Sequence, residues 1–176
     1  MPDAPVCNPS KEVFESPSKY ADWANSTAAM IDNSSLKANG DKVVISAGRS
    51  LQAAFNLCST ERFLKQPTPA MCSGFLVGPN LLVTAGHCIR TMGDCNTYSW
   101  VFDYNMKNDD EANLTVASSS VYKCKSIVAR DLNRTTKNDF ALITLDRNVE
   151  GRASLPVRKS GKVSANSELV VIGHLS

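Results

Sequence analysis

The sequence is 176 residues long, 43% hydrophobic and 20% charged, which is typical of a globular protein and excludes a disordered chain. Its net charge of +2, with scattered lysines and arginines, excludes an electrostatic basis for binding nucleic acid or an anionic membrane surface. No apolar stretch approaches the roughly 20 residues of a membrane-spanning helix. We therefore expect neither nucleic acid nor membrane as a partner.

The first third of the chain predicts a surface arm followed by short strands. Residues 1–24 are rich in proline, serine and charge, show no signal peptide, and predict an arm that lies on the surface or is partly disordered. Two short apolar runs, 27–31 and 43–45, predict strands, and the residues between them, 32–41, predict turns. Residues 51–57 fit either a strand or a helical turn.

The most distinctive stretch of the sequence is 71–90. Two strand-length apolar runs flank Gly-Pro-Asn at 78–80, which predicts a tight β-hairpin. Cys72 opens the hairpin and Cys88 closes it, with His87 beside Cys88. A histidine at a strand end is well placed for catalysis, although a single histidine is more often a structural residue.

The rest of the chain predicts further strands separated by loops. Residues 91–97 and 105–113 are polar and predict loops, whereas 99–104 and 121–128 alternate apolar with polar residues and predict strands. At 138–145, Asn-Asp precedes an apolar run of strand length. Many short strands without a long amphipathic helix predict an all-β sandwich or barrel.

Two motifs resemble those of chymotrypsin-like (trypsin-like) serine proteases. Cys-Ser-Gly-Phe at 72–75 and Leu-Val-Thr-Ala-Gly-His-Cys at 82–88 resemble the region around the catalytic histidine of this family. Where animal trypsins usually have Ala-Ala-His-Cys, this sequence has Ala-Gly-His-Cys, which is more similar to the sequences of the bacterial glutamyl-endopeptidase branch. Residues 61–67 also resemble the segment that precedes the histidine strand in bacterial members. Asn-Asp-Phe-Ala-Leu-Ile at 138–143 resembles the family's Asn-Asp-Ile-Ala-Leu-Leu motif.

The resemblance implies a fold and a division of the chain. The fold is an all-β, chymotrypsin-like, six-stranded antiparallel barrel. Residues 1–24 are then the arm and 25–147 the first barrel, while 148–176 form a connector and the first strand of a second barrel that is largely absent. The sequence is expected to be the amino-terminal half of a protease.

The resemblance also implies that His87 is the general base and that Asp139 orients it. A buried carboxylate at the start of an apolar strand is costly unless it has a hydrogen-bond partner, which an imidazole N–H supplies. The carboxylate in turn fixes the imidazole tautomer and stabilises the imidazolium. The order histidine, then aspartate, is that of the family. The alternative for Asp139 is a carboxylate that caps a turn.

A nucleophilic serine is not evident. Neither Gly-Asp-Ser-Gly-Gly nor Gly-x-Ser-x-Gly occurs, and Ser50 and Ser73 lack a glycine pattern that would build an oxyanion hole. We therefore expect a fragment of a serine endopeptidase that cleaves polypeptides through an acyl-enzyme, inert without its other half. His174, after Ile-Gly, is expected to be structural. The alternatives are a non-catalytic protease-like binding module and a relative with a cysteine nucleophile.

Six cysteines in a chain of this size suggest an oxidising compartment, so we expect a secreted or periplasmic protein; the alternative is a cytosolic protein that keeps them as thiols. A disulfide between Cys72 and Cys88 is favoured across the hairpin, as the resemblance also implies. Sequence alone leaves open how the others pair, which are Cys7, Cys58, Cys95 and Cys124. Without a Cys-x-x-Cys pair, and with two histidines far apart, neither a zinc site nor another cofactor is expected. Asn-x-Ser/Thr sequons matter only in a glycosylating host, and they begin at Asn25, Asn33, Asn113 and Asn133.

Overall fold

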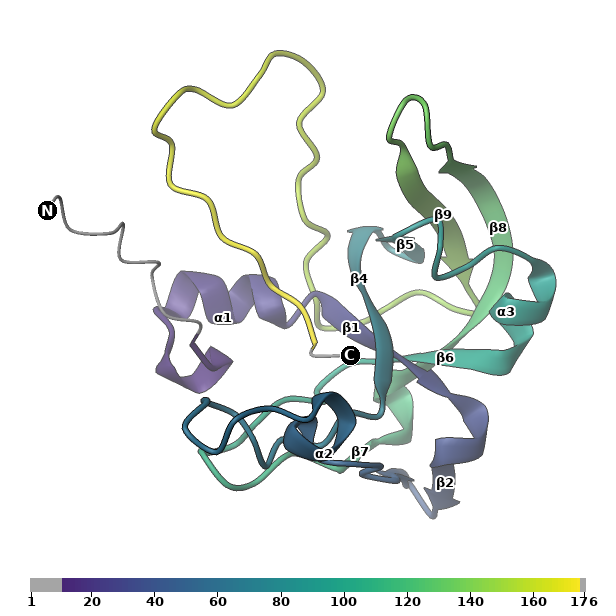
Figure 1. Cartoon of the computed structure of the whole chain (residues 1–176). Helices are drawn as coiled ribbons and strands as arrows, with labels where there is room; N and C mark the ends of the chain where they lie inside the picture. Colours follow the sequence, from purple (N-terminus) through teal and green to yellow (C-terminus); the bar gives the residue numbers. More distant parts are fainter. Residues whose placement is uncertain (1–10, 175–176) are drawn as a thin grey trace, which may run out of the picture.

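Six antiparallel strands close into a barrel in the order β1-β4-β5-β9-β8-β6, and a three-stranded sheet, β2-β3-β7, lies beside it (Figure 1). The computed structural model describes residues 11–174. The predicted fold class, an all-β protein with one chymotrypsin-like six-stranded barrel, is confirmed.

Most of the strands are short, although β8 has 12 residues, and most are separated by turns or single helical turns. The barrel strands are β1 (Thr27–Asp32), β4 (Ala70–Gly78), β5 (Leu81–Thr84), β6 (Tyr98–Val101), β8 (Val121–Leu132) and β9 (Asp139–Leu145). The small sheet consists of β2 (Leu36–Asn39), β3 (Lys42–Ile45) and β7 (Thr115–Ala117). The α-helices are α1 (Ser18–Ala24), α2 (Leu51–Phe55) and α3 (Met92–Thr97), and the 3₁₀ turns are η1 (Val13–Glu15), η2 (Asn33–Ser35) and η3 (Ser118–Ser120).

Strand β1 closes the barrel because it pairs on both edges. Its Met30 lies opposite Cys72 of β4 on one side and opposite Trp100 of β6 on the other. The barrel interior is filled by large side chains with no more than 1% of their surface exposed, among them Trp100, Phe102, Leu76, Leu82 and Ile143. Each such side chain contributes about 1.5–3 kcal/mol relative to an exposed one, so the barrel core provides the rigid frame for the loops at its ends.

Several segments differ from the sequence-based expectations. The predicted turn region 32–41 contains β2, and the strand expected at 43–45 belongs to the small sheet instead of the barrel. Residues 51–57 take the helical alternative, since Ser50 caps α2 by accepting from the N–H of Ala53.

Two segments expected to be irregular contain short helices. The loop expected at 91–97 contains α3, because Thr91 and Asp94 form a capping box. The expected surface arm folds locally within its described part into η1 and α1. Residues 148–176, expected to form a connector and the first strand of a second barrel, contain no strand within their described part, 148–174, because no neighbouring strand there pairs with their backbone.

Two disulfides stabilise the barrel region. One joins Cys72 to Cys88, and the other joins Cys95 of α3 to Cys124 of β8. Cys58 is exposed and forms no disulfide within residues 11–174, and Cys7 lies outside the described residues.

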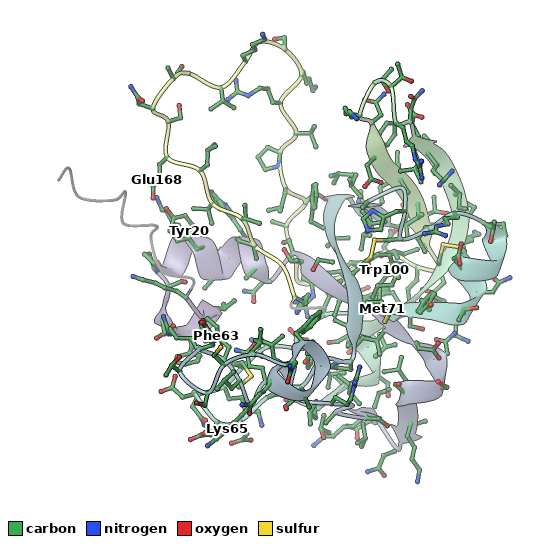
Figure 2. All side chains as sticks on the ribbon, viewed as in Figure 1. Tyr20, Phe63, Lys65, Met71, Trp100 and Glu168 are labelled. Carbon is green, nitrogen blue, oxygen red and sulfur yellow. A yellow bond between two sulfur atoms is a disulfide. The ribbon has the colours of Figure 1, made fainter. Side chains whose placement is uncertain are left out.

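The segment after β9 forms a long loop that extends away from the barrel and returns to it, drawn in yellow in Figure 1. The hydroxyl of Tyr20 in α1 donates a 2.5 Å hydrogen bond to Glu168 of this loop (Figure 2). Within residues 11–174, no helix combines the length and the apolar character needed to cross a membrane.

Candidate active site

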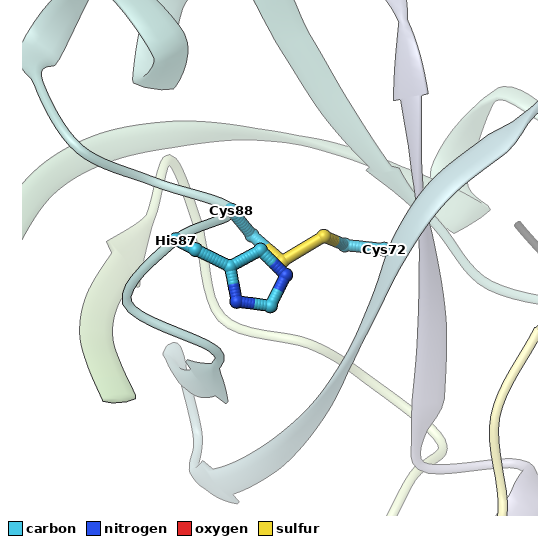
Figure 3. Close-up of side chains that lie close together, drawn as sticks. All are labelled: Cys72, His87 and Cys88. Carbon is cyan, nitrogen blue, oxygen red and sulfur yellow. A yellow bond between two sulfur atoms is a disulfide. The ribbon is translucent and has the colours of Figure 1, made fainter. Parts of the chain in front are cut away.

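His87 lies on a tight turn at the end of β5. The turn closes with a 3.1 Å hydrogen bond from the N–H of Cys88 to the carbonyl of Ala85. Just before it, the buried hydroxyl of Thr84 donates to the carbonyl of Ser73 at 2.8 Å and ties the end of β5 to β4. The disulfide from Cys88 to Cys72 ties the other end of the turn to the same strand, beside the imidazole (Figure 3). The histidine is therefore held at both ends of its turn.

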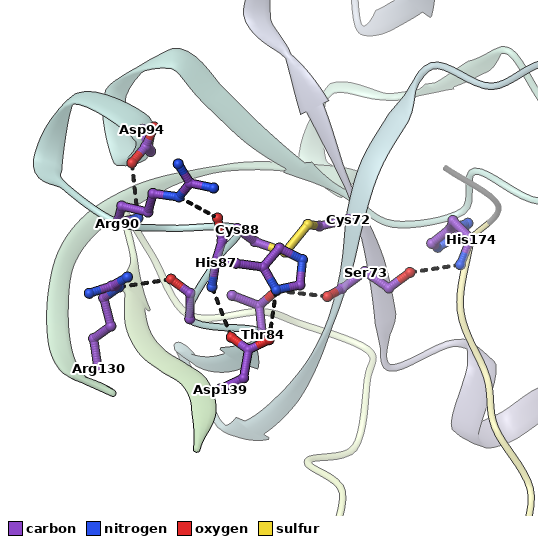
Figure 4. Close-up of a disulfide and its surroundings, with 11 residues drawn as sticks. Cys72, Ser73, Thr84, His87, Cys88, Arg90, Asp94, Arg130, Asp139 and His174 are labelled. Atoms are coloured by element: carbon purple, nitrogen blue, oxygen red, sulfur yellow. Dashed lines mark hydrogen bonds and ion pairs between the residues drawn. A yellow bond between two sulfur atoms is a disulfide. The ribbon is translucent and has the colours of Figure 1, made fainter. Parts of the chain in front are cut away.

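Strand register places Asp139 next to that turn. Thr84 at the end of β5 lies opposite Ala141 of β9, so the first residue of β9 reaches just beyond the end of β5. His87 Nδ1 lies 2.7 Å from Asp139 Oδ2, although 52 residues separate them. The other carboxylate oxygen, Oδ1, accepts the backbone N–H of His87 at 2.9 Å (Figure 4). One carboxylate thus fixes both the ring and the backbone of the histidine.

The hydrogen bond from His87 is the main reason that the pKa of Asp139 lies below its ordinary value. Burial opposes this shift, and the backbone N–H groups of His87 and Gly86 and the charge of the His87 ring lower the pKa further, so that all these effects together outweigh burial. The side chains of His87 and Asp139 are 55% and 39% exposed, so the expectation of a buried carboxylate is wrong. The pair lies at the end of the barrel, outside the core.

The pairing determines what the imidazole can do. A carboxylate at Nδ1 favours the tautomer with the proton on Nδ1, which leaves the lone pair on Nε2. Among the described residues, His87 Nε2 has no hydrogen-bond partner. An imidazole with this tautomer, an open Nε2 and a carboxylate behind it can accept a proton from a nucleophile and return it later.

The two serines considered from the sequence have structural contacts. Ser50 caps α2, and Ser73 Oγ accepts the backbone N–H of His174 at 2.7 Å, on the side of β4 away from the imidazole (Figure 4). His174 packs its ring against Tyr104 with 5.5 Å between ring centroids, and its Nε2 has no partner among the described residues. Burial lowers the pKa of His174 to about 4, so its ring is neutral near pH 7.

The site does not fit a bound metal ion. The Sγ atoms of Cys72 and Cys88 and a ring nitrogen of His87 lie within 4.8 Å of one another. Both sulfurs are consumed in the disulfide, so neither is a thiolate that could bind zinc.

Sequence reasoning missed two arginines that contact the histidine turn. Arg130 Nε donates to the carbonyl of Gly86 at 2.8 Å, and Arg90 Nε donates to the carbonyl of His87 at 3.1 Å. Arginine is common on exposed strand and loop positions, and no sequence motif marks these two. Only the register of β8 against β9 and the path of the turn bring them to His87.

Comparison with known protein families gives a match that covers most of the chain. The family model described as Trypsin matches residues 39–174, a range that includes both His87 and Asp139. A comparison with curated proteins finds no match.

Proposed function

This chain belongs to the trypsin family of serine proteases, and we propose that it contributes the histidine and the aspartate of a serine endopeptidase. The observation that carries the proposal is the 2.7 Å contact between His87 Nδ1 and Asp139 Oδ2, together with the second bond from the same carboxylate to the His87 N–H. A carboxylate that merely capped a turn would have no reason to bind the ring as well.

In the proposed reaction, His87 Nε2 takes the proton of a serine hydroxyl as its oxygen attacks the carbonyl carbon of a peptide substrate. The imidazolium then gives this proton to the leaving amine, and an acyl-enzyme remains for water to hydrolyse. Asp139 holds the tautomer and stabilises the imidazolium. The serine and the oxyanion donors would come from polypeptide outside this sequence, because no serine motif of the family occurs within it.

Two finer features belong to the same proposal. We propose that the 176-residue chain alone is inert, since the family's active site lies between two barrels and the structure has a single closed barrel within its described residues. We also propose that the chain belongs to the glutamyl-endopeptidase branch and that the whole protease cleaves after acidic residues. The support for this is the resemblance of the sequence around Gly86 and His87 to that branch.

The proposed location is a secreted or periplasmic one. The two disulfides support it because such bonds form and persist in oxidising compartments.

An active-site titrant tests the proposal. The native protein that carries this sequence is treated with a fluorophosphonate, and we expect covalent labelling of a serine that disappears in a His87→Ala variant. The isolated 176-residue chain is expected to remain unlabelled, and labelling of that chain would disprove its inertness. If the native protein is neither labelled nor able to hydrolyse peptides, the serine endopeptidase proposal is wrong and a non-catalytic binding module replaces it.

A further inference from the structure

The turn that carries His87 is pressed against the hairpin formed by β8 and β9. A Cβ atom at Gly86 would lie 2.6 Å from the carbonyl oxygen of Asp131 and 2.8 Å from that of Phe140. Real Cβ atoms do not approach backbone oxygens so closely, so only glycine allows the turn to lie at this distance from the two strands. The close approach of the turn to the two strands therefore explains why a glycine precedes His87.

This close approach brings the carbonyl of Gly86 within reach of a side chain from β8. Arg130 lies opposite Ala141 in the hairpin, and its Nε donates to the Gly86 carbonyl at 2.8 Å. The same peptide group, which joins Gly86 to His87, donates its N–H to Asp139 Oδ1 at 2.9 Å. Because a peptide group is planar, its C=O and N–H are fixed relative to each other. Arg130 and Asp139 thus hold one rigid unit from opposite ends.

The next peptide group has a weaker contact of the same kind. Arg90 Nε donates to the carbonyl of His87 at 3.1 Å, and the N–H of Arg90 is itself held by Asp94 Oδ2 at 2.9 Å. The two peptide planes on either side of the His87 Cα determine its φ and ψ, and so the direction in which its side chain leaves the backbone. Figure 4 shows the two arginines approaching the turn from different directions.

We propose that Arg130 is a positioning residue for the catalytic histidine, acting through the peptide group between Gly86 and His87. Its hydrogen bond keeps that peptide in the orientation in which one carboxylate can accept both the N–H and the Nδ1–H of His87. Gly86 and Arg130 act as a pair, since the glycine permits the approach and the arginine fixes it. The expected effect of Arg130 on turnover rests on the proposed function, whereas its expected effect on the geometry of the His87 turn does not.

The first test needs no catalysis and uses the 176-residue chain. Hydrogen exchange by NMR reports the backbone amide of His87, with the buried strand amide of Leu82 as a measure of global stability. In Arg130→Met we expect His87 exchange to accelerate by about tenfold or more while Leu82 changes by less than about twofold. The matched control is Arg134→Met, which removes an exposed arginine from the same hairpin that has no hydrogen-bond partner among the described residues.

Two further variants separate positioning from general stabilisation. Arg130→Lys keeps a cationic donor and is expected to restore part of the protection at His87. Gly86→Ala is expected to break the same contact, so adding Arg130→Met to it should have little further effect on the His87 amide. Unchanged exchange at His87 in Arg130→Met would overturn the proposal. Equal acceleration at His87 and Leu82 would also overturn it, because Arg130 would then stabilise the barrel as a whole.

The second test uses the native protein and depends on its being a protease. Arg130→Met is expected to lower kcat by between about tenfold and about 100-fold with KM changed less than about twofold, because a misplaced base slows the chemical step. A change in KM alone would contradict the proposal. If the native protein has no protease activity, the proposed function fails while the exchange experiment still decides the role of Arg130.

Discussion

The backbone N–H of His174 donates a 2.7 Å hydrogen bond to Ser73 Oγ, across 101 residues of sequence. Ser73 follows Cys72, the residue whose disulfide holds the His87 turn. The returning end of the long loop after β9 therefore contacts the strand that supports the candidate active site, on the face opposite the imidazole.

We predict that this contact weakens in acid. Burial lowers the pKa of His174 from 6.5 to about 4. The docked state, in which the end of the loop contacts Ser73 and the His174 ring is buried, therefore favours the neutral ring. For a histidine with a lowered pKa, the docked state has its full stability above pH 6.5 and loses it as the pH falls toward 4, by at most about 1.4 kcal/mol per pH unit. The protection factor of the His174 amide, which corrects for the slower intrinsic exchange in acid, should fall over this interval. His174→Phe, which cannot titrate, should show no such fall, and a wild-type ring that titrates near 6.5 would contradict the prediction.

Asp139→Asn is predicted to impair catalysis more than stability. The amide would favour the wrong histidine tautomer, and kcat of the native protease should fall by about four orders of magnitude. The exposed pair contributes little to folding. Because the pKa of Asp139 lies below 3.8 in the fold, any stability difference from wild type is present at neutral pH and disappears as the pH falls through the lowered value.

Steady-state kinetics and urea unfolding at pH 7 and pH 3 check this prediction. Asp109→Asn is the control, since it removes the same charge from an exposed loop. Wild-type kcat in Asp139→Asn would mean that Asp139 does not orient the base.

The two disulfides are predicted to make similar contributions to stability. Their sequence separations of 16 for Cys72–Cys88 and 29 for Cys95–Cys124 correspond to about 3 and about 3.5 kcal/mol of loop entropy in the unfolded chain. Replacing either pair by alanines should lower the free energy of unfolding in urea by these amounts. Cys58→Ser, at an exposed cysteine that forms no disulfide within residues 11–174, should change it by less than about 0.5 kcal/mol. Only the first replacement should also disturb His87, because only Cys88 adjoins it.

Gly74→Ala is predicted to destabilise the barrel from within. A Cβ at this position would lie 2.4 Å from a methyl of Leu82 and 2.6 Å from the ring of Trp100, both of which are buried. Overpacking of this kind costs about 1–3 kcal/mol. Thermal unfolding measures the loss. In Gly93→Ala, the control in α3, the new methyl meets only the Thr91 hydroxyl at 3.2 Å, so stability should not fall comparably.

The sequence was informative where a residue pattern has a local physical cause. Gly-Pro-Asn between apolar runs predicts the β4–β5 hairpin, and the strand at Asp139 follows from an apolar run after Asn-Asp. The helix α3 was missed because six residues with a capping box resemble a polar loop in composition. The turn region after β1 contains β2 because its partner β3 supplies the pairing, which no window of that region reveals.

The site could be predicted only in part for a similar reason. Family motifs identified His87 and Asp139 as candidates, but the contact of Arg130 with the Gly86 carbonyl depends on the register between β8 and β9. The partner of Cys95 likewise depends on α3 packing against β8. Long-range relationships of this kind have no signature in a single sequence.

The closure of the barrel by β1 has a consequence for how the protein is made. β1 leaves the ribosome before its neighbours β4 and β6. In the same way, β5 is synthesised before β9, with which it pairs. Pairings between distant segments slow folding, so the barrel forms late relative to synthesis. His87 and Asp139 meet only when β9 is in place, and a nascent chain that already contains the histidine therefore has no organised pair of these two side chains.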